Sequence, residues 1–304
     1  MKFLGVIAFL FLMLALALAS YFLWLNLPVG ETNSGEYLQN LDYGTPGQSQ
    51  FYQNMRYRGS EISYFIEGLC SDKKRQDSVG AFDYLEENTV LRFTQVENAE
   101  DSEILILCSE IEPKAEEAGH FVAGEGGPSA VVNATQFNVI FTGRVSLFRE
   151  DLCDKPQVAL HEILHSLGFD HNNNSQSIMF PVTNCKQTLD EEIISEINSL
   201  YGTPEFSDLV VEKVSASKTG AYLDFEVVVS NYGLKDSLDS KLELIVSGKT
   251  VKEFSLDIVE IGTKKILSVQ NVKISRSAES VRFLVNSEED ELSKENNWAD
   301  VVLG

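Results

Sequence analysis

The sequence predicts an α+β domain built on a mixed sheet with three helices, followed by an all-β sandwich, behind an N-terminal transmembrane helix. Three observations carry this prediction: an uncharged apolar N-terminus, alternating strand and helix patterns up to about residue 202, and strand patterns alone from residue 206. At 304 residues the chain is long enough for two ordinary domains. The expected segments are a signal anchor (1–27), a stalk or linker (28–59), the α+β domain (60–203) and the sandwich (206–304).

The N-terminus predicts a membrane anchor. Residues 3–30 contain no charged residue, and the run up to residue 25 is almost wholly apolar, longer than the about 20 residues that a membrane-spanning helix needs. Lys2 precedes this segment and Glu31 follows it, so the positive-inside tendency places the rest of the chain outside the cytoplasm. Residues 17–19 (ALA) resemble a signal-peptidase site, so a cleaved and secreted form is the alternative. Residues 28–59 show no sustained helical or strand period and predict an extended stalk.

The next elements predict a sheet with a helical crossover. Short apolar runs indicate strands at 62–66, 91–96 and 104–107, and a helical pattern covers 72–87. This order implies a right-handed crossover. We expect GEGGPS (124–129) to be a loop, and no phosphate cradle because no GK[ST] follows it. The segments VVNAT and NVIFTGRVSLF then indicate further strands or an edge hairpin.

Two more helices close the α+β domain. Asp154, followed by a lysine and a proline, is typical of a helix N-cap, and this helix is expected to run to Gly168. Thr188 and Glu191 form a capping-box pattern that opens the last helix, which Gly202 ends. From residue 206 the pattern changes to strands such as YLDFEVVVS, KLELIVSG, KKILSVQ and SVRFLVN, which predict a β-sandwich.

The acidic composition argues against nucleic acid as a partner. The chain has 46 acidic and 24 basic residues and a formal net charge of −22. Proteins that bind nucleic acid need clustered Lys and Arg to displace counterions from phosphate. We interpret the acidity as a well-solvated surface, with specific cation binding as the alternative.

The stretch HEILHSLGFDH (161–171) holds three of the four histidines and predicts a metal centre. On a helix, His161 and His165 lie on one face with Cβ atoms about 5–6 Å apart, so both imidazoles can bind one cation. Glu162 lies about 100° around the helix and can reach a metal-bound water as a general base. Gly168 can take a positive φ, end the helix and return His171 as a third ligand. Three imidazoles around Zn²⁺ leave a position open for water, which is typical of a catalytic site.

The segment SIMFP (177–181) strengthens this interpretation, since Met179 lies eight residues after His171. HEILHSLGFDH and SIMFP together resemble the matrixin branch of the metzincin zinc proteases, with Met179 at the Met-turn. The resemblance covers about residues 60–202, because AFDYLEENTVLRFTQV is similar to the family's first helix and second strand, and LDEEIISEINSLYG to its closing helix. It implies a mostly parallel, twisted sheet.

The resemblance also implies the roles of single residues. His161, His165 and His171 would bind one catalytic zinc, and Glu162 would deprotonate the water that attacks a peptide carbonyl. A protein or peptide substrate would pair with an edge strand, and Phe180, Pro181 and Val182 would line the pocket for the residue after the scissile bond. Two departures are that Asn172 stands where many matrixins have Ser or Thr, and that the histidine set of a second, structural zinc is missing.

In the matrixin sheet, the strands before Cys70 and Cys108 are parallel neighbours, which implies a disulfide between these two cysteines. With Cys70 and Cys108 paired, Cys153 and Cys185 are left to form a second disulfide between the loops that flank the zinc site. A free or metal-linked Cys153 is the alternative.

The C-terminal segment resembles a CARDB-type adhesion module, on the basis of VVVSNYGLKDS and the ending VNSEEDELSKENNWADVVL. This resemblance implies an immunoglobulin-like sandwich that positions the enzyme or binds a surface partner. We interpret the acidic residues 288–291 as a solvated loop, with a Ca²⁺ site as the alternative that the sequence does not establish.

The resulting hypothesis is a membrane-anchored, outward-facing zinc endopeptidase with a C-terminal β-sandwich. The rival hypothesis is a cell-surface adhesion or binding protein whose protease domain is an inactive scaffold. The intact set of three histidines and Glu162 weighs against the rival.

Overall fold

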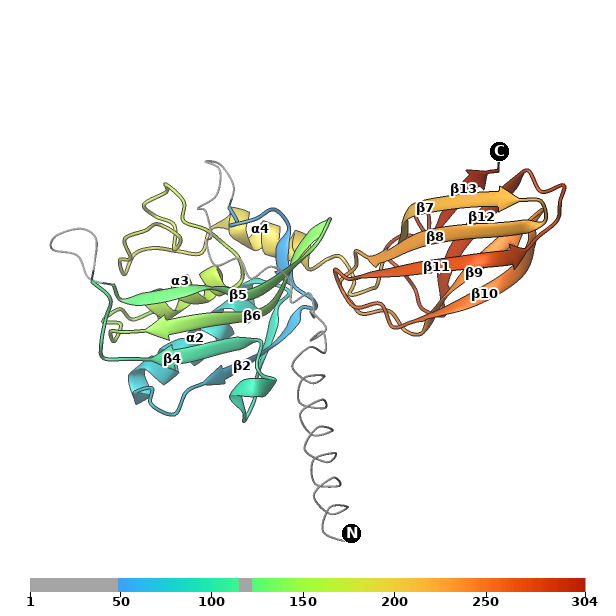
Figure 1. The fold of residues 1–304 in the computed structure, drawn as a ribbon. Coiled ribbons are helices and arrows are strands. Elements are labelled where there is room, and N and C mark those ends of the chain that lie inside the picture. Colours follow the sequence, from blue (N-terminus) through green and yellow to red (C-terminus); the bar gives the residue numbers. More distant parts are fainter. Residues whose placement is uncertain (1–48, 115–121, 304) are drawn as a thin grey trace, which may run out of the picture. The chain divides into compact units, whose positions relative to one another are not determined.

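The computed structural model describes residues 49–114 and 122–303 (Figure 1). The expected anchor (1–27) and most of the expected stalk (28–59) lie outside these residues. Within the described ranges, no helix has both the length and the apolar character needed to cross a bilayer.

The N-terminal domain is built on one mixed sheet. Its strands are β1 (Met55–Tyr57), β2 (Glu61–Ile66), β3 (Arg92–Gln95), β4 (Ile104–Cys108), β5 (Gly124–Ala134) and β6 (Phe137–Leu147). They follow the order β1-β6-β4-β2-β3 with every pair on this path parallel, and β5 pairs antiparallel with β6. The expected mixed and mostly parallel sheet is therefore confirmed. Because β1 and β4 share one edge of β6 and β5 takes the other, β5 is an edge strand of the described sheet.

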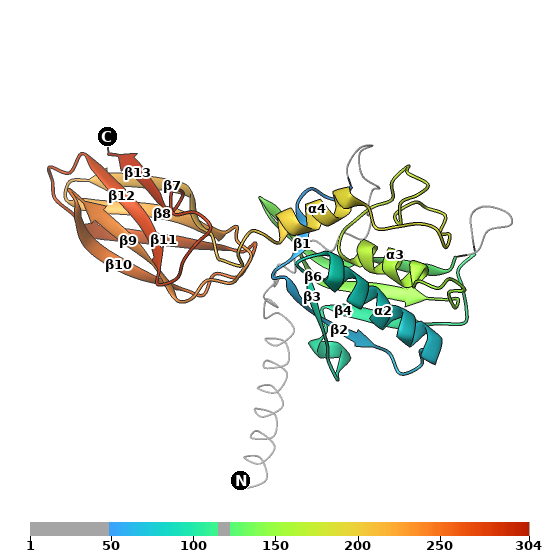
Figure 2. The same ribbon diagram turned by 180° about the vertical axis from the view of Figure 1, so that it is seen from behind.

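Three α-helices are present in the described part of the chain: α2 (Asp72–Asn88), α3 (Gln157–Ser166) and α4 (Glu191–Leu200). A short 3₁₀ turn covers Ala99–Asp101. Figure 2 shows α2 and α3 side by side against one face of the sheet. Phe82 and Leu85 of α2 and Ile163 of α3 are buried in the core between the layers. This packing sets α3 on the sheet.

The glycine-rich segment is a strand, and the prediction of a loop at GEGGPS is wrong. Gly124 pairs with Leu147 and the ladder continues along β5 and β6. A Cβ atom on Gly126 would lie 2.1 Å from the backbone oxygen of Glu162, so α3 can pack this close to β5 only because the strand carries glycine there. The glycines indicate a close approach between backbones, which a local sequence pattern does not distinguish from a turn.

Both predicted helix caps also differ in the structure. Asp151 binds the start of α3, because its carboxylate accepts hydrogen bonds from the N–H groups of Cys153 (2.8 Å) and Val158 (3.0 Å), whereas the sequence predicts Asp154. The N-cap of α4 is Asp190 rather than Thr188. The backbone of Thr188 accepts a hydrogen bond from the N–H of Ile178 (2.8 Å), so it still belongs to the preceding loop.

The folded domain begins before residue 60. Met55 and Tyr57 are fully buried in β1, inside the segment expected as stalk. Arg56 is only 1% exposed, and its guanidinium donates hydrogen bonds to the carbonyls of Leu200 and Thr203, where α4 ends. Its guanidinium carbon also lies 4.5 Å from the centre of the Tyr201 ring. The segment therefore ties the sheet to the last helix.

The C-terminal domain is a sandwich of two antiparallel sheets. Their orders are β10-β9-β12-β13 and β11-β8-β7. The strands are β7 (Leu209–Thr219), β8 (Tyr222–Asn231), β9 (Ser240–Val246), β10 (Lys249–Asp257), β11 (Lys264–Lys273), β12 (Ser280–Ser287) and β13 (Trp298–Val302). Side chains such as Val227, Leu242 and Phe283 from the two sheets share one buried core. The predicted all-β domain is confirmed.

Candidate metal centre

Helix α3 places three of the predicted site residues in the interior of the domain. His161, Glu162 and His165 are all buried, with Glu162 7% exposed. Phe51 stacks on the imidazole of His165 with ring centres 5.7 Å apart. Phe51 lies within the segment that the sequence assigns to the stalk, and no local pattern marks it as part of the site.

The turn after α3 returns the third histidine. Gly168 has φ +97°, a conformation that favours glycine, and a Cβ atom there would lie 2.6 Å from Cγ of Met55. The N–H of Phe51 donates to the carbonyl of Gly168 (2.9 Å), and the N–H of Asp170 donates to that of Ser49 (2.9 Å). The residues around position 50 thus hold the turn that leads to His171.

The three imidazoles converge through their Nε2 atoms. The Nε2–Nε2 distances are 3.0 Å for His161 and His165, 3.1 Å for His165 and His171, and 3.2 Å for His161 and His171. Nδ1 of His161 donates to the carbonyl of Ile178 (2.6 Å) and Nδ1 of His165 to that of Phe169 (2.7 Å), which leaves both Nε2 atoms as lone-pair donors. A tetrahedral ion with Zn–N bonds of 2.0–2.1 Å needs nitrogens about 3.3 Å apart. The donor set therefore fits zinc.

Burial favours the neutral form of these imidazoles. Burial lowers the pKa of His161 to about 4, lowers the pKa of His165 well below its ordinary value and lowers that of His171. Burial, with the charge of Glu125 as a second cause, raises the pKa of Glu162 to about 8. A cation held by the histidines would favour the ionised carboxylate of Glu162.

The buried hydroxyl of Ser177 connects Met179 to Asn172, the residue after His171. Met179 is fully buried, its N–H donates to Oγ of Ser177 (3.0 Å), and its carbonyl accepts from the N–H of Asn172 (2.9 Å). Ser177 Oγ also accepts a hydrogen bond from Nδ2 of Asn172 (2.7 Å) and donates one to Asp190. Asn172, the residue after His171, is therefore hydrogen-bonded to the segment that contains Met179.

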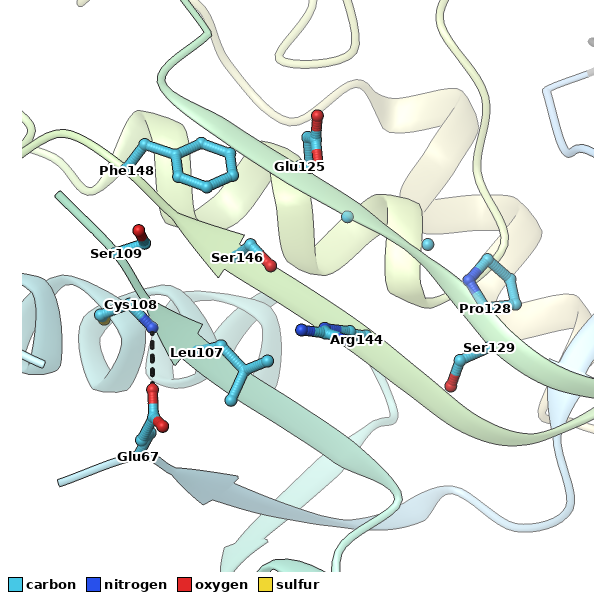
Figure 3. A pocket seen from close by; sticks show the side chains of 12 residues that line it. Glu67, Leu107, Cys108, Ser109, Glu125, Pro128, Ser129, Arg144, Ser146 and Phe148 are labelled. Carbon is cyan, nitrogen blue, oxygen red and sulfur yellow. Dashed lines mark hydrogen bonds between the residues drawn. The ribbon is translucent and has the colours of Figure 1, made fainter. Parts of the chain in front are cut away.

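Phe180, Pro181 and Val182 follow Met179 in a loop, half-buried at Phe180 and exposed at the other two. The lining of a substrate pocket by these three residues stays a prediction. A cavity of about 660 Å³ lies instead on the face of the sheet away from α3, where Figure 3 shows Arg144, Ser146 and Glu125 projecting from β5 and β6. None of the three loop residues lines that cavity.

Both predicted disulfides are confirmed. Cys70 is bonded to Cys108, next to the ends of β2 and β4, and Cys153 is bonded to Cys185. The second bond joins the loop before α3 to the loop after Met179, so the alternative of a free or metal-linked Cys153 is wrong.

Residues 54–202 match the family model described as Matrixin, and residues 206–301 match the one described as CARDB. Stromelysin-2 of Rattus norvegicus is 28% identical over 60% of this chain and 41% of its own length. Macrophage metalloelastase of the same species is 30% identical over 50% of this chain and 35% of its own length. The chain thus spans less than half the length of these curated relatives.

Among solved structures, the chain is similar to the CARDB domain of a Pyrococcus furiosus protein in complex with di-metal ions. The identity is 22% and the TM-score 0.27, over 33% of this chain and 90% of the other.

Proposed function

Because the chain contains a matrixin domain at residues 54–202 followed by a CARDB domain, we propose that it is a zinc-dependent endopeptidase acting on proteins or peptides. One observation carries the proposal: the Nε2 atoms of His161, His165 and His171 converge to within 3.0–3.2 Å of one another, with Glu162 buried beside them. Zinc bound by these nitrogens would supply Lewis acidity, which makes water a nucleophile near neutral pH.

The chain's own residues would then move the proton. Glu162 follows His161 on α3, about 100° around the helix, and its side chain lies against Gly124 of β5, so it does not take the place of a histidine nitrogen. Its carboxylate oxygen accepts a proton from the attacking water and delivers it to the nitrogen of the leaving amine. Burial of Glu162 excludes bulk water from this transfer and holds the side chain in one place.

The edge of β5 is the proposed site of the substrate backbone. In the described part of the sheet β5 pairs only with β6, so its other edge has free N–H and C=O groups. Its glycines pack against α3 at Glu162, which brings this edge next to the candidate centre. An extended peptide paired with the edge would lie across the histidines.

The test compares single variants of the zinc-loaded full chain, purified in detergent because residues 3–25 are almost wholly apolar. We expect the parent protein to cleave unfolded casein, Glu162→Ala to lose at least about 10³-fold in kcat/KM while keeping one zinc, and His171→Ala to lose zinc as well. Glu192→Ala serves as the matched control, because Glu192 is an exposed glutamate of α4 remote in sequence from the centre.

Equal inactivity of the parent and the Glu162 variant across a broad peptide library would instead favour the rival hypothesis. In that case the matrixin domain would be an inactive scaffold and the CARDB domain the functional part.

We also propose that the enzyme works outside the cytoplasm, anchored by residues 1–27, with the CARDB domain binding a surface partner. Two disulfides support an oxidising compartment. Protease added to intact cells should digest the catalytic domain. Protection until the cells are lysed would overturn the proposed location.

A further inference from the structure

Five polar residues gather where the sandwich begins. The chain enters the domain along residues 207–209, and this segment lies beside the last loop, because Leu292 N–H donates to the carbonyl of Ser207 (2.9 Å) and Leu209 N–H to the carboxylate of Glu291 (2.8 Å). We call the group the amide–carboxylate cluster. Its members are Ser207, Asp208, Glu291, Asn296 and Asn297.

Unpartnered buried oxygens distinguish this cluster. In the described residues, the buried side-chain atoms without a hydrogen-bond partner are Ser207 Oγ, Asn296 Oδ1 and Asn297 Oδ1, and all three belong to the cluster. Ser207 is 0% and Asn297 3% exposed. Buried polar groups are almost always satisfied, so three unpartnered oxygens within one hydrogen-bonded cluster indicate a ligand.

The amide orientations are determined by their neighbours. Asn296 Nδ2 donates to Asp208 Oδ1 (3.1 Å), and Asn297 Nδ2 donates to Glu291 Oε1 (3.0 Å). Flipping either amide would place two oxygens against each other, so the free atoms are carbonyl oxygens and not misassigned N–H donors. The cluster thus presents acceptors that lack a positive partner.

The two carboxyl groups of the cluster also lack an ion-pair partner. Asp208 is buried and Glu291 half-buried, and burial raises the pKa of both carboxyls. At Glu291, hydrogen bonds from Leu209, Asn297 and Ser287 and the charge of Lys294 offset part of this effect. Across residues 49–114 and 122–303, neither Asp208 nor Glu291 forms an ion pair. A bound cation would satisfy the carboxylates and the orphan oxygens together.

We propose that the amide–carboxylate cluster binds a calcium ion. Its donors are carboxylate, amide and hydroxyl oxygens, the ligands that Ca²⁺ accepts in flexible coordination, whereas zinc prefers nitrogen and sulfur. Magnesium demands near-ideal octahedral geometry and gives up water reluctantly, so a mixed set of neutral and charged oxygens fits calcium better. The ligands come from both ends of the domain in sequence, so calcium would join the first strand to the last loop.

The test is calorimetric titration of the full chain with calcium, after zinc loading and removal of free calcium. The double variant Asp208→Asn with Glu291→Gln keeps the side-chain shapes and removes two negative charges. The control, Glu288→Gln with Asp290→Asn, removes two charges from exposed positions of the same loop. We expect the cluster variant to bind one calcium fewer than the parent, and the control to bind as many as the parent.

Two further measurements keep the proposal open to refutation. Asn296→Ala removes one orphan oxygen without changing charge and should weaken calcium binding at least tenfold even if the double variant fails to fold. Calcium should also raise the unfolding temperature of the parent sandwich more than magnesium does. Equal calcium binding by parent, Asn296→Ala and double variant would overturn the proposal and leave buried water as the partner of these oxygens. Glu162→Ala should bind calcium like the parent, so this result is independent of peptidase activity.

Discussion

Replacing Gly126 with alanine should disable the candidate centre, although Gly126 binds neither metal nor substrate through a side chain. A Cβ atom at this position would lie 2.1 Å from the backbone oxygen and 2.7 Å from the carbonyl carbon of Glu162. Backbone atoms cannot rotate away as a side chain can. Relief of the clash therefore requires β5 or α3 to move by about 1 Å.

The expected loss follows from this displacement. Misplacement of a catalytic group by about 1 Å costs on the order of 10²-fold in rate, and overpacking a tight contact costs about 1–3 kcal/mol of stability. We expect Gly126→Ala to lower kcat/KM for casein about 100-fold and the free energy of unfolding in urea by about 2 kcal/mol. Zinc should still bind, because His161 and His165 move together on one helix.

Gly127 provides the matched control. It is the next residue of β5, and a Cβ atom there would meet nothing within 4 Å. Gly127→Ala should keep kcat/KM and stability close to the parent values, because the added methyl group meets no other atom and leaves the pairing of β5 with β6 intact. Parent-like activity and stability in Gly126→Ala would refute the steric argument. Equal losses in both variants would assign the effect to the strand edge rather than to the helix contact.

Three other substitutions test the surroundings of the centre. Arg56→Met should lower the free energy of unfolding by about 3 kcal/mol, measured in urea, because it removes the hydrogen bonds that the buried guanidinium donates to the carbonyls of Leu200 and Thr203. Unchanged stability would contradict this role. Ser177→Ala removes the hydroxyl that Asn172, Met179 and Asp190 share as a hydrogen-bond partner. It should weaken zinc binding about 10-fold to 100-fold in chelator competition. Parent-like zinc affinity would show that the hydroxyl does not position the loop that carries His171. Replacing Cys153 and Cys185 by serine removes a disulfide with a sequence separation of 32 and should cost about 3–4 kcal/mol in thermal unfolding. If the variant remains this much less stable than the parent when both are reduced, the loss comes from packing instead.

Much of the candidate centre was predictable because its chemistry is local in sequence. His161, Glu162 and His165 take their relative positions from the helical period, and the positive φ of Gly168 returns His171 within three residues. These relations depend on backbone geometry that any helix and turn would share. The alternating strands of the C-terminal sandwich were predictable for the same reason. The disulfide pairings came from the family resemblance, since spacing alone allows three connectivities.

Several features of the site depend on contacts between segments that are distant in sequence, and only the tertiary structure decided them. Phe51 stacks on His165, and Arg56 binds the end of α4. Both residues belong to a stretch whose weak periodicity predicts a stalk. GEGGPS reads as a loop because glycine permits turns, but its glycines serve the approach of α3 to β5. Asp190 and Ser177 likewise meet only in the fold.

The physical reason is that periodicity and capping patterns report the conformation of about ten neighbouring residues. Burial and hydrogen bonding also depend on which segments meet in space. The sequence by itself determined the histidine pattern of the candidate centre and the class of each domain. The folded chain decided which residues hold Glu162 and the histidines in place, and where buried oxygens remain for a cation.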